Sequence, residues 1–163
     1  MTNYHLAQLN VASPRAPLDD PSMAGFVDEL VLINARADDS PGFVWRLVGE
    51  DSDDATSLRP FGPDLMVNMS VWESVEALRD FTYRDGTHLE QLRRRREWFS
   101  REGLGSHLVL WWIPAGTIPR LEHARERLAL LDRVGPGPEA FTLREPYPAP
   151  SLGGHDRLAA GRQ

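Results

Sequence analysis

The sequence contains neither cysteine nor lysine among its 163 residues. The absence of cysteine excludes thiolate nucleophiles, disulfides, iron–sulfur clusters and cysteine-ligated zinc. All 18 basic residues are arginine, which excludes Schiff-base catalysis, an anchored pyridoxal phosphate and a P-loop lysine. Any catalysis must therefore use histidine, aspartate, glutamate, tyrosine, serine or threonine, with arginine as a fixed cation.

The chain also lacks an apolar run of the ~20 residues that a membrane-spanning helix needs. Its N-terminus lacks the basic and then apolar pattern of a signal peptide. The net charge of −6 disfavours nucleic acid and anionic membranes as partners, despite the four consecutive arginines at positions 93 to 96. We therefore expect a cytoplasmic protein that binds neither nucleic acid nor membrane.

Hydrophobic residues make up 41% of the chain and charged residues 26%, a balance typical of one globular domain with a real core. We expect residues 1–150 to form this single domain. Residues 151–163 are rich in glycine and polar side chains, and this composition predicts a flexible C-terminal tail.

Hydrophobic periodicity predicts four strands, at residues 4–12, 43–48, 65–72 and 107–113, and helices at residues 20–36, 73–83, 87–99 and 119–134. The order of strand, helix, strand, strand, helix, strand is that of a ferredoxin-like βαββαβ unit in the α+β class. The last helix is an addition at the C-terminal end. In this topology we expect the first and third strands to be adjacent and parallel in the centre of the sheet.

Polar side chains interrupt these two central strands. The predicted pairing brings Gln8 and Asn10 beside Asn68 and Ser70. Each buried polar group without a partner costs about 1 to 3 kcal/mol. A bound polar ligand or ordered water could provide the partners, and the alternative is that the four residues satisfy one another across the strands.

The sheet should carry apolar side chains on both faces. Trp72 and one of Trp111 or Trp112 would be exposed on the face away from the helices. A second copy of the chain that packs sheet against sheet would cover them. We therefore predict a homodimer with a barrel-like interior.

One histidine lies at a predicted helix start. Thr87 and Glu90 fit the capping-box pattern, which makes Thr87 the N-cap and His88 the first helical residue. The helix dipole disfavours added positive charge there, so His88 should stay neutral near pH 7 and could act as base, donor or ligand. It shares one side of its helix with Leu92, Arg95 and Phe99. The alternative is a capped helix with a half-buried histidine and a solvated arginine run.

The five histidines contain no HxH, HxxxH or HExxH pattern. His5 and His107 begin strands that run antiparallel, so they should lie at opposite ends of the sheet. We therefore predict no dedicated metal site.

The sequence contains, in this order, the blocks YHLAQLN, DDPSMAGFVDELVLINA, SPGFVWRL, NMSVWESVEALRDFTYRDGTHLEQLRRRREWF and HLVLWWIPAG. Together they resemble the bacterial domain-of-unknown-function family 3291, which is related to the antibiotic-biosynthesis monooxygenase group of dimeric α/β barrels. The family pattern of a tyrosine, a histidine and an arginine run ending in Glu-Trp-Phe is matched by Tyr83, His88 and residues 93 to 99. A departure lies at residues 84 to 87.

The resemblance implies a dimeric α/β barrel whose relatives include cofactor-independent oxygenases, isomerases and decyclising enzymes on aromatic or polyketide-like substrates, and haem-binding enzymes. The first hypothesis is a small-molecule enzyme without a cofactor, in which His88 moves a proton. Its substrate-binding residues would be Gln8, Asn10, Asn68, Ser70, Trp72, Tyr83 and Arg95.

Two other functions remain open. In one, His88 is an axial haem ligand and Arg95 or Arg96 pairs a propionate. In the other, the chain is a non-catalytic binding or interaction domain whose tryptophans fill the core.

Overall fold

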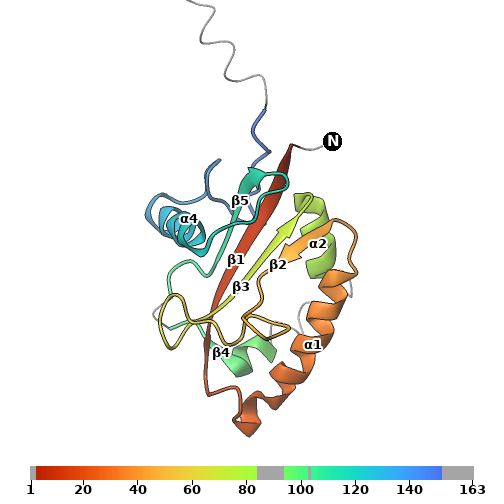
Figure 1. Cartoon of the computed structure of the whole chain (residues 1–163). Helices are drawn as coiled ribbons and strands as arrows, with labels where there is room; N and C mark the ends of the chain where they lie inside the picture. The colour runs from red at the N-terminus through yellow and green to blue at the C-terminus, as the bar shows by residue number, and fades with distance from the viewer. Residues whose placement is uncertain (1–2, 84–93, 103, 152–163) are drawn as a thin grey trace, which may run out of the picture.

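The computed structural model describes residues 3–83, 94–102 and 104–151. Its elements follow one another along the chain in a mixed α and β order (Figure 1). They are β1 (Tyr4–Pro14), the short 3-10 helix η1 (Pro21–Met23), α1 (Ala24–Asp38), β2 (Phe43–Arg46), β3 (Met66–Trp72), α2 (Val75–Tyr83), β4 (Phe99–Ser100), β5 (Leu108–Pro114) and α4 (Leu121–Val134).

Local sequence signals explain where the helices begin and end. The Asp20 carboxylate accepts a hydrogen bond from the backbone N–H of Ser22 at 2.9 Å, and Pro21 begins η1, as expected for an N-cap followed by proline. Gly135 ends α4 with a φ of 77°, the region that glycine adopts without strain. The helix predicted to reach Phe99 ends one residue earlier, because Phe99 pairs with Pro14 in β4.

The sheet has the order β2-β3-β1, with β5 on the other side of β1 and the two-residue β4 paired to the end of β1. This is the predicted ferredoxin-like arrangement. The first and third strands are adjacent as expected, but the prediction that they run parallel is wrong, because β1 and β3 pair antiparallel. The antiparallel register places Gln8 opposite Ser70 and Asn10 opposite Asn68.

One face of the sheet packs against α4, which lies on the opposite side of the sheet from α1 and α2 (Figure 1). Ala124 and Leu131 of α4 join a buried cluster with the strands, and Leu47, Leu58, Phe61 and Leu65 close it from the segment after β2. The strand residues of this face are Ala7, Leu9, Val11, Val67, Met69, Val71, Val109, Trp111 and Ile113.

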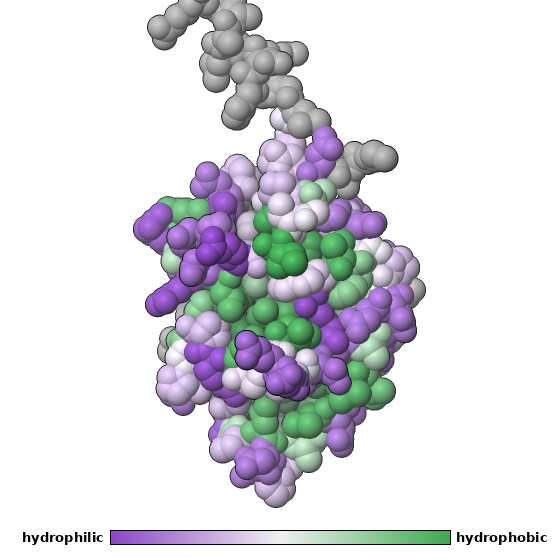
Figure 2. Space-filling model, in the orientation of Figure 1, coloured by the Kyte–Doolittle hydropathy of each residue, from purple (hydrophilic) through white to green (hydrophobic). Residues whose placement is uncertain are grey.

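The other face packs against α2. Val75 and Leu78 of α2 contact a cluster that contains Leu6, Trp72 and Leu110. By contrast, Ala37 is the buried residue of α1, while Val31 and Leu32 of the same helix are more than 60% exposed. Figure 2 shows apolar side chains at the surface on the side where α1 lies.

Both sheet faces are therefore covered within a single chain. Trp72 is 1% exposed on the α2 side and Trp111 is 2% exposed on the α4 side. Trp72 is covered by α2 together with Phe43 and Phe81, and Trp111 by α4 and the segment after β2. Trp112, which shares the α2-side face with Trp72, is half-buried. The fully exposed tryptophans from which we inferred a homodimer are therefore absent from the described sheet. The homodimer remains a prediction without this argument. In the described part of the chain, no helix has the length and apolarity needed to cross a membrane.

Candidate functional site

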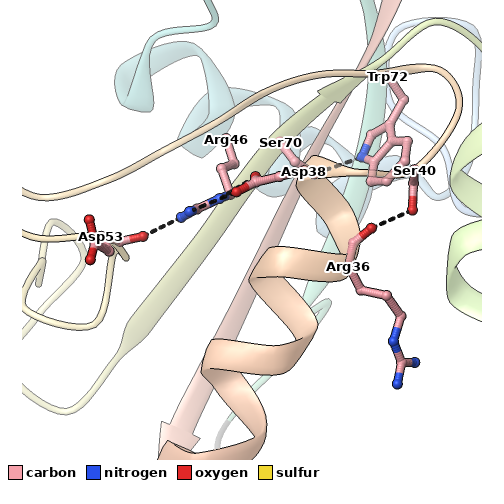
Figure 3. A network of polar contacts seen from close by, with 7 residues as sticks. All are labelled: Arg36, Asp38, Ser40, Arg46, Asp53, Ser70 and Trp72. Carbon is pink, nitrogen blue, oxygen red and sulfur yellow. Dashed lines mark hydrogen bonds and ion pairs between the residues drawn. The ribbon is translucent and has the colours of Figure 1, made fainter.

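The centre of the α2-side face holds a chain of polar contacts. Trp72 Nε1 donates a hydrogen bond to Ser70 Oγ at 2.9 Å (Figure 3). Ser70 Oγ donates in turn to Gln8 Oε1 at 2.8 Å across the strands. All three side chains are buried. The predicted alternative of mutual satisfaction across the strands is thus confirmed for the Gln8 and Ser70 pair.

The next cross-strand pair that the structure describes on this face, Asn10 and Asn68, is not joined by a side-chain hydrogen bond. Asn10 and Asn68 are opposite in register, with Asn10 half-buried and Asn68 exposed. Among the described residues, neither side-chain amide has a hydrogen-bond partner. Two amides on central strands thus remain available to a ligand or to water.

Aromatic rings of the protein itself surround Trp72. Phe81 of α2 stacks on its ring, with centroids 5.0 Å apart and an interplanar angle of 28°. Phe43 of β2 meets it edge-on at 5.3 Å. Phe81 and Phe43 therefore enclose the indole ring, which is 1% exposed.

A cation borders this polar chain from the next strand. Arg46 of β2 lies opposite Ser70 in register. Its guanidinium pairs with the Asp38 carboxylate and donates to the backbone carbonyl of Asp53 (Figure 3). The charge beside the site is thus compensated by Asp38.

A second cluster of basic residues, namely His107, Arg101 and Arg95, lies near the place where β4 and β5 meet β1. The backbone of His107 accepts a hydrogen bond from Val11 at 2.8 Å, just before β5 begins. Desolvation, and then the charges of Arg101 and Arg95, lower the pKa of His107 below its ordinary value. The three groups are close enough to interact, and they favour a neutral imidazole at pH 7.

The remaining predicted site residues fall into two groups. His88 lies outside the described residues, as do its predicted cap and Leu92. Tyr83 is the last residue of α2 and is 46% exposed, and Arg95 is an exposed residue in the helical turn at positions 94 to 98. The structure therefore brings Gln8, Asn10, Asn68, Ser70 and Trp72 onto one face.

Two surface hollows lie elsewhere. One, of about 340 Å³, is at the end of α4 beside Gly135, and another, of about 630 Å³, lies between Arg15 and Arg59 near the end of β1. Neither contains a predicted site residue, so we place the candidate site by its chemistry on the α2-side face. No group of three or more metal-binding side chains gathers among the residues that the structure describes.

Three residues of this site were not predicted from the sequence, namely Phe43, Phe81 and Arg46. The place of Arg46 opposite Ser70 depends on the strand register, which the sequence pattern does not give. The spacing of Ser70 and Trp72 was the available signal for their contact, because residues two apart in a strand share a face.

Solved structures similar to this chain are distant. One is SnoaB, a cofactor-independent oxygenase from Streptomyces nogalater, with 18% identity, a TM-score of 0.46, and coverage of 71% of this chain and 98% of that chain. Another is the NE2512 protein of unknown function from Nitrosomonas europaea, with 12% identity, a TM-score of 0.43, and coverage of 72% and 97%. No functionally curated protein matches the chain by sequence.

A family model matches more of this chain than the solved structures do. The model of the family described as "Domain of unknown function (DUF3291)" matches residues 5–156. Apart from Tyr4, the first residue of β1, this range contains every described helix and strand and all the candidate site residues. The chain therefore belongs to the DUF3291 family, as its sequence blocks predicted.

Proposed function

We propose that the chain is a small-molecule enzyme of the monooxygenase-like type, which oxygenates or isomerises an aromatic or polyketide-like substrate without a cofactor. The observation that carries this proposal is the pair of unpartnered amides on the two central strands. Asn68 is exposed and Asn10 is half-buried, on a face that combines the hydrogen-bonded Gln8 and Ser70 with apolar and aromatic side chains. A planar apolar substrate with polar oxygens matches that mixture.

The amides would act on the substrate oxygen. Asn10 and Asn68 can donate hydrogen bonds to a carbonyl oxygen, and these bonds strengthen as the oxygen gains enolate charge. His88 would remove the substrate proton, which requires it to approach within about 3 Å of the reacting group. The resulting carbanion would react directly with dioxygen in an oxygenase, or be reprotonated elsewhere in an isomerase.

Trp72 takes a different part in this proposal from the one first expected. Its ring is stacked on Phe81 and its N–H is bonded to Ser70. We therefore assign Trp72 to the wall of the site, where it orients the side chains of Ser70 and Gln8. Tyr83 and Arg95 would complete the substrate site from the two sides of residues 84–93.

A second candidate function is non-catalytic binding or interaction. It is favoured by the burial of Trp72, Trp98 and Trp111, which are 1%, 8% and 2% exposed and fill space between the elements. A homodimer in the cytoplasm is part of both candidates. Sedimentation would test the dimer, and cell fractionation would test the location.

The two candidates separate in a capture experiment. The protein is purified without oxygen, its bound small molecules are identified by native mass spectrometry, and air is then admitted. An oxygenase should convert a captured aromatic molecule to a product that has gained one oxygen atom and lost two hydrogen atoms, while the second oxygen atom of dioxygen leaves as water. The variant His88→Ala should keep the captured molecule unchanged.

A matched control variant shows whether a lack of conversion is specific to His88. Asn3→Ala removes an asparagine at the start of the chain and should behave as the wild type. A captured molecule that has the same mass and the same structure in wild type and His88→Ala, both before and after air is admitted, would favour the binding candidate. Equal conversion by wild type and His88→Ala would refute the assignment of His88.

A further inference from the structure

The hydrogen bonds between Trp72, Ser70 and Gln8 run in one direction. An indole N–H donates and cannot accept, so Ser70 Oγ accepts the bond from Trp72 Nε1. The Ser70 hydroxyl proton is then directed to Gln8 Oε1, its acceptor at 2.8 Å. The side-chain amide of Gln8 is thereby oriented, with its oxygen toward Ser70 and its NH2 group left as a donor.

The surroundings of this NH2 group offer it no acceptor in the described part of the chain. Asn10 follows on the same face, about 6.6 Å further along the strand, and Asn68 lies opposite Asn10. The residues in register at these two positions of the sheet are Gln8, Ser70, Leu110, Arg46, Asn10, Asn68 and Leu108. None of these carries a carboxylate. Asn10 and Asn68 can each present either an oxygen or an NH2 group, so Gln8 is the amide at these positions whose NH2 group is held in one direction by its hydrogen bond to Ser70.

We infer that Trp72 and Ser70 are positioning residues that hold Gln8 as a hydrogen-bond donor, so that the site selects planar ligands through an acceptor oxygen of a ketone, enolate or phenolate. A ligand hydroxyl at the same place can accept from the NH2 group through its oxygen, but Gln8 then offers no acceptor for the hydroxyl proton. This inference rests on the proposed function, because it concerns the same site. It adds the polarity of the ligand group and the reason for a serine and a tryptophan two residues apart.

The burial of the hydrogen-bonded side chains explains why the Gln8 amide keeps its orientation. Gln8 is 7% exposed and Ser70 is 8% exposed. A rotated Gln8 amide would leave the Ser70 proton without an acceptor in a buried place, which is unfavourable. A donor held in advance also loses less entropy when it binds its acceptor.

The first test needs no ligand. The Trp72 indole N–H is followed by 1H–15N NMR in the wild type and in the variant Ser70→Ala. We expect its resonance to shift and its exchange with solvent to accelerate in Ser70→Ala. Ser40→Ala is the matched control, since Ser40 is also 8% exposed but donates to the backbone carbonyl of Arg36 (Figure 3). An unchanged Trp72 resonance in Ser70→Ala would overturn the inference.

The second test measures ligand polarity with three planar probes of similar size. 9-Fluorenone presents only an acceptor, 9-hydroxyfluorene presents both an acceptor and a donor, and fluorene presents neither. The wild type should bind fluorenone roughly tenfold more tightly than fluorene, which is the factor expected for one hydrogen bond. The carbonyl stretch of bound fluorenone should move to lower frequency.

The variant Gln8→Glu gives the sharpest result. It keeps the shape of the side chain and the acceptor for Ser70, but it replaces the NH2 donor by a carboxylate oxygen. The preference should reverse, with 9-hydroxyfluorene bound more tightly than fluorenone. If Gln8→Glu does not fold, Ser70→Ala should lower the preference for fluorenone several-fold, while Ser40→Ala keeps the wild-type preference.

The outcomes separate this inference from the proposed function. Equal affinity of the wild type for fluorenone and fluorene would overturn the inference and leave the small-molecule site in place. Failure of all three probes to bind would contradict the proposed function, while the NMR test of the Trp72 indole would still decide whether the chain of hydrogen bonds exists.

Discussion

Arg46 and Asp38 form a two-pronged ion pair between β2 and the end of α1. Arg46 Nε lies 2.8 Å from Asp38 Oδ1, and Nη2 lies 3.3 Å from Oδ2. The same guanidinium donates to the backbone carbonyl of Asp53, and the Arg46 side chain is only 18% exposed. One side chain therefore joins a strand, a helix and the segment after β2, next to Ser70.

Replacing Arg46 by methionine keeps much of the apolar stem and removes the donors. We expect Arg46→Met to lower the free energy of unfolding by about 1 to 3 kcal/mol, since it leaves the Asp53 carbonyl and the Asp38 carboxylate without this partner. Urea denaturation measures this loss. Arg94→Met is the matched control, because Arg94 pairs with Glu29 while 54% of its side chain is exposed, and such pairs contribute only about 0 to 1 kcal/mol. Equal losses in the two variants would contradict the joining role of Arg46.

Gly42 sits at a close approach between the turn before β2 and α2. Its φ is 82°, and a Cβ at this position would lie 2.5 Å from the Cβ of Ala77. Gly116 has a similar φ of 85° but no atom within 4 Å of such a Cβ. Alanine at either position carries the conformational cost of about 1 to 2 kcal/mol for a left-handed residue.

Comparing the two alanine variants therefore isolates the cost in stability of the steric clash between residue 42 and Ala77. Gly42→Ala should be less stable than Gly116→Ala by an additional amount of about 1 to 3 kcal/mol, the usual cost of overpacking. Thermal unfolding of both variants gives the comparison. Similar melting temperatures would show that α2 moves away from Gly42 at little cost.

Strand positions were predictable because alternation is a local property. The side chains of Val67, Met69 and Val71 all enter one buried cluster, as their spacing predicted. Alternation reads the same in both chain directions, however, so it could not show that β1 and β3 pair antiparallel. The register still brought Asn10 to Asn68, since both directions keep the two positions on one face.

The covering of the sheet could not be predicted in the same way. Trp111 is buried because α4 and the segment after β2 fold back over its face. Those contacts join residues far apart in the sequence, and periodicity carries no information about them. For the same reason, the stacking of Phe81 on Trp72 became visible only in the folded chain.

Substitution of Asn68 should affect ligand binding without affecting the stability of the fold. Its side chain is exposed, so Asn68→Ala should change the free energy of unfolding by no more than about 0.5 kcal/mol. In contrast, Ser70→Ala should cost about 1 to 3 kcal/mol, because it leaves the Trp72 N–H and Gln8 Oε1 without their common partner. Denaturation and probe binding should be measured on the same samples. A large loss of stability in Asn68→Ala would indicate a structural role instead of the proposed substrate contact.

The haem alternative makes a spectroscopic prediction. If the enzyme uses no cofactor, adding haem to the purified protein should leave the absorption band of free haem unshifted. Axial ligation by His88 would shift this Soret band, and His88→Ala would remove the shift. A shift that persists in His88→Ala but is lost in Arg95→Gln would indicate propionate binding without axial ligation by His88.

His107 should make the stability of the fold depend on pH. Desolvation, Arg101 and Arg95 lower its pKa in the folded chain, whereas the unfolded chain keeps the ordinary value of about 6.5. In the acid range below that value, the unfolded state therefore binds more protons than the folded state. The contribution of His107 is fully present above about pH 6.5 and is lost as the pH falls through the lowered pKa.

This dependence can be assigned to His107 by comparing denaturation at pH 7.5 and at successively lower pH. His107→Gln should lose less stability than the wild type over this acid range, because it has no imidazole to protonate. Arg101→Gln removes one of the charges that oppose protonation, so the imidazole pKa measured by NMR should rise. Arg120→Gln removes the same charge at the far end of α4, where Arg120 is 69% exposed, and should leave that pKa unchanged. An equal rise in both arginine variants would mean that net charge, and not the neighbouring Arg101, controls the protonation of His107.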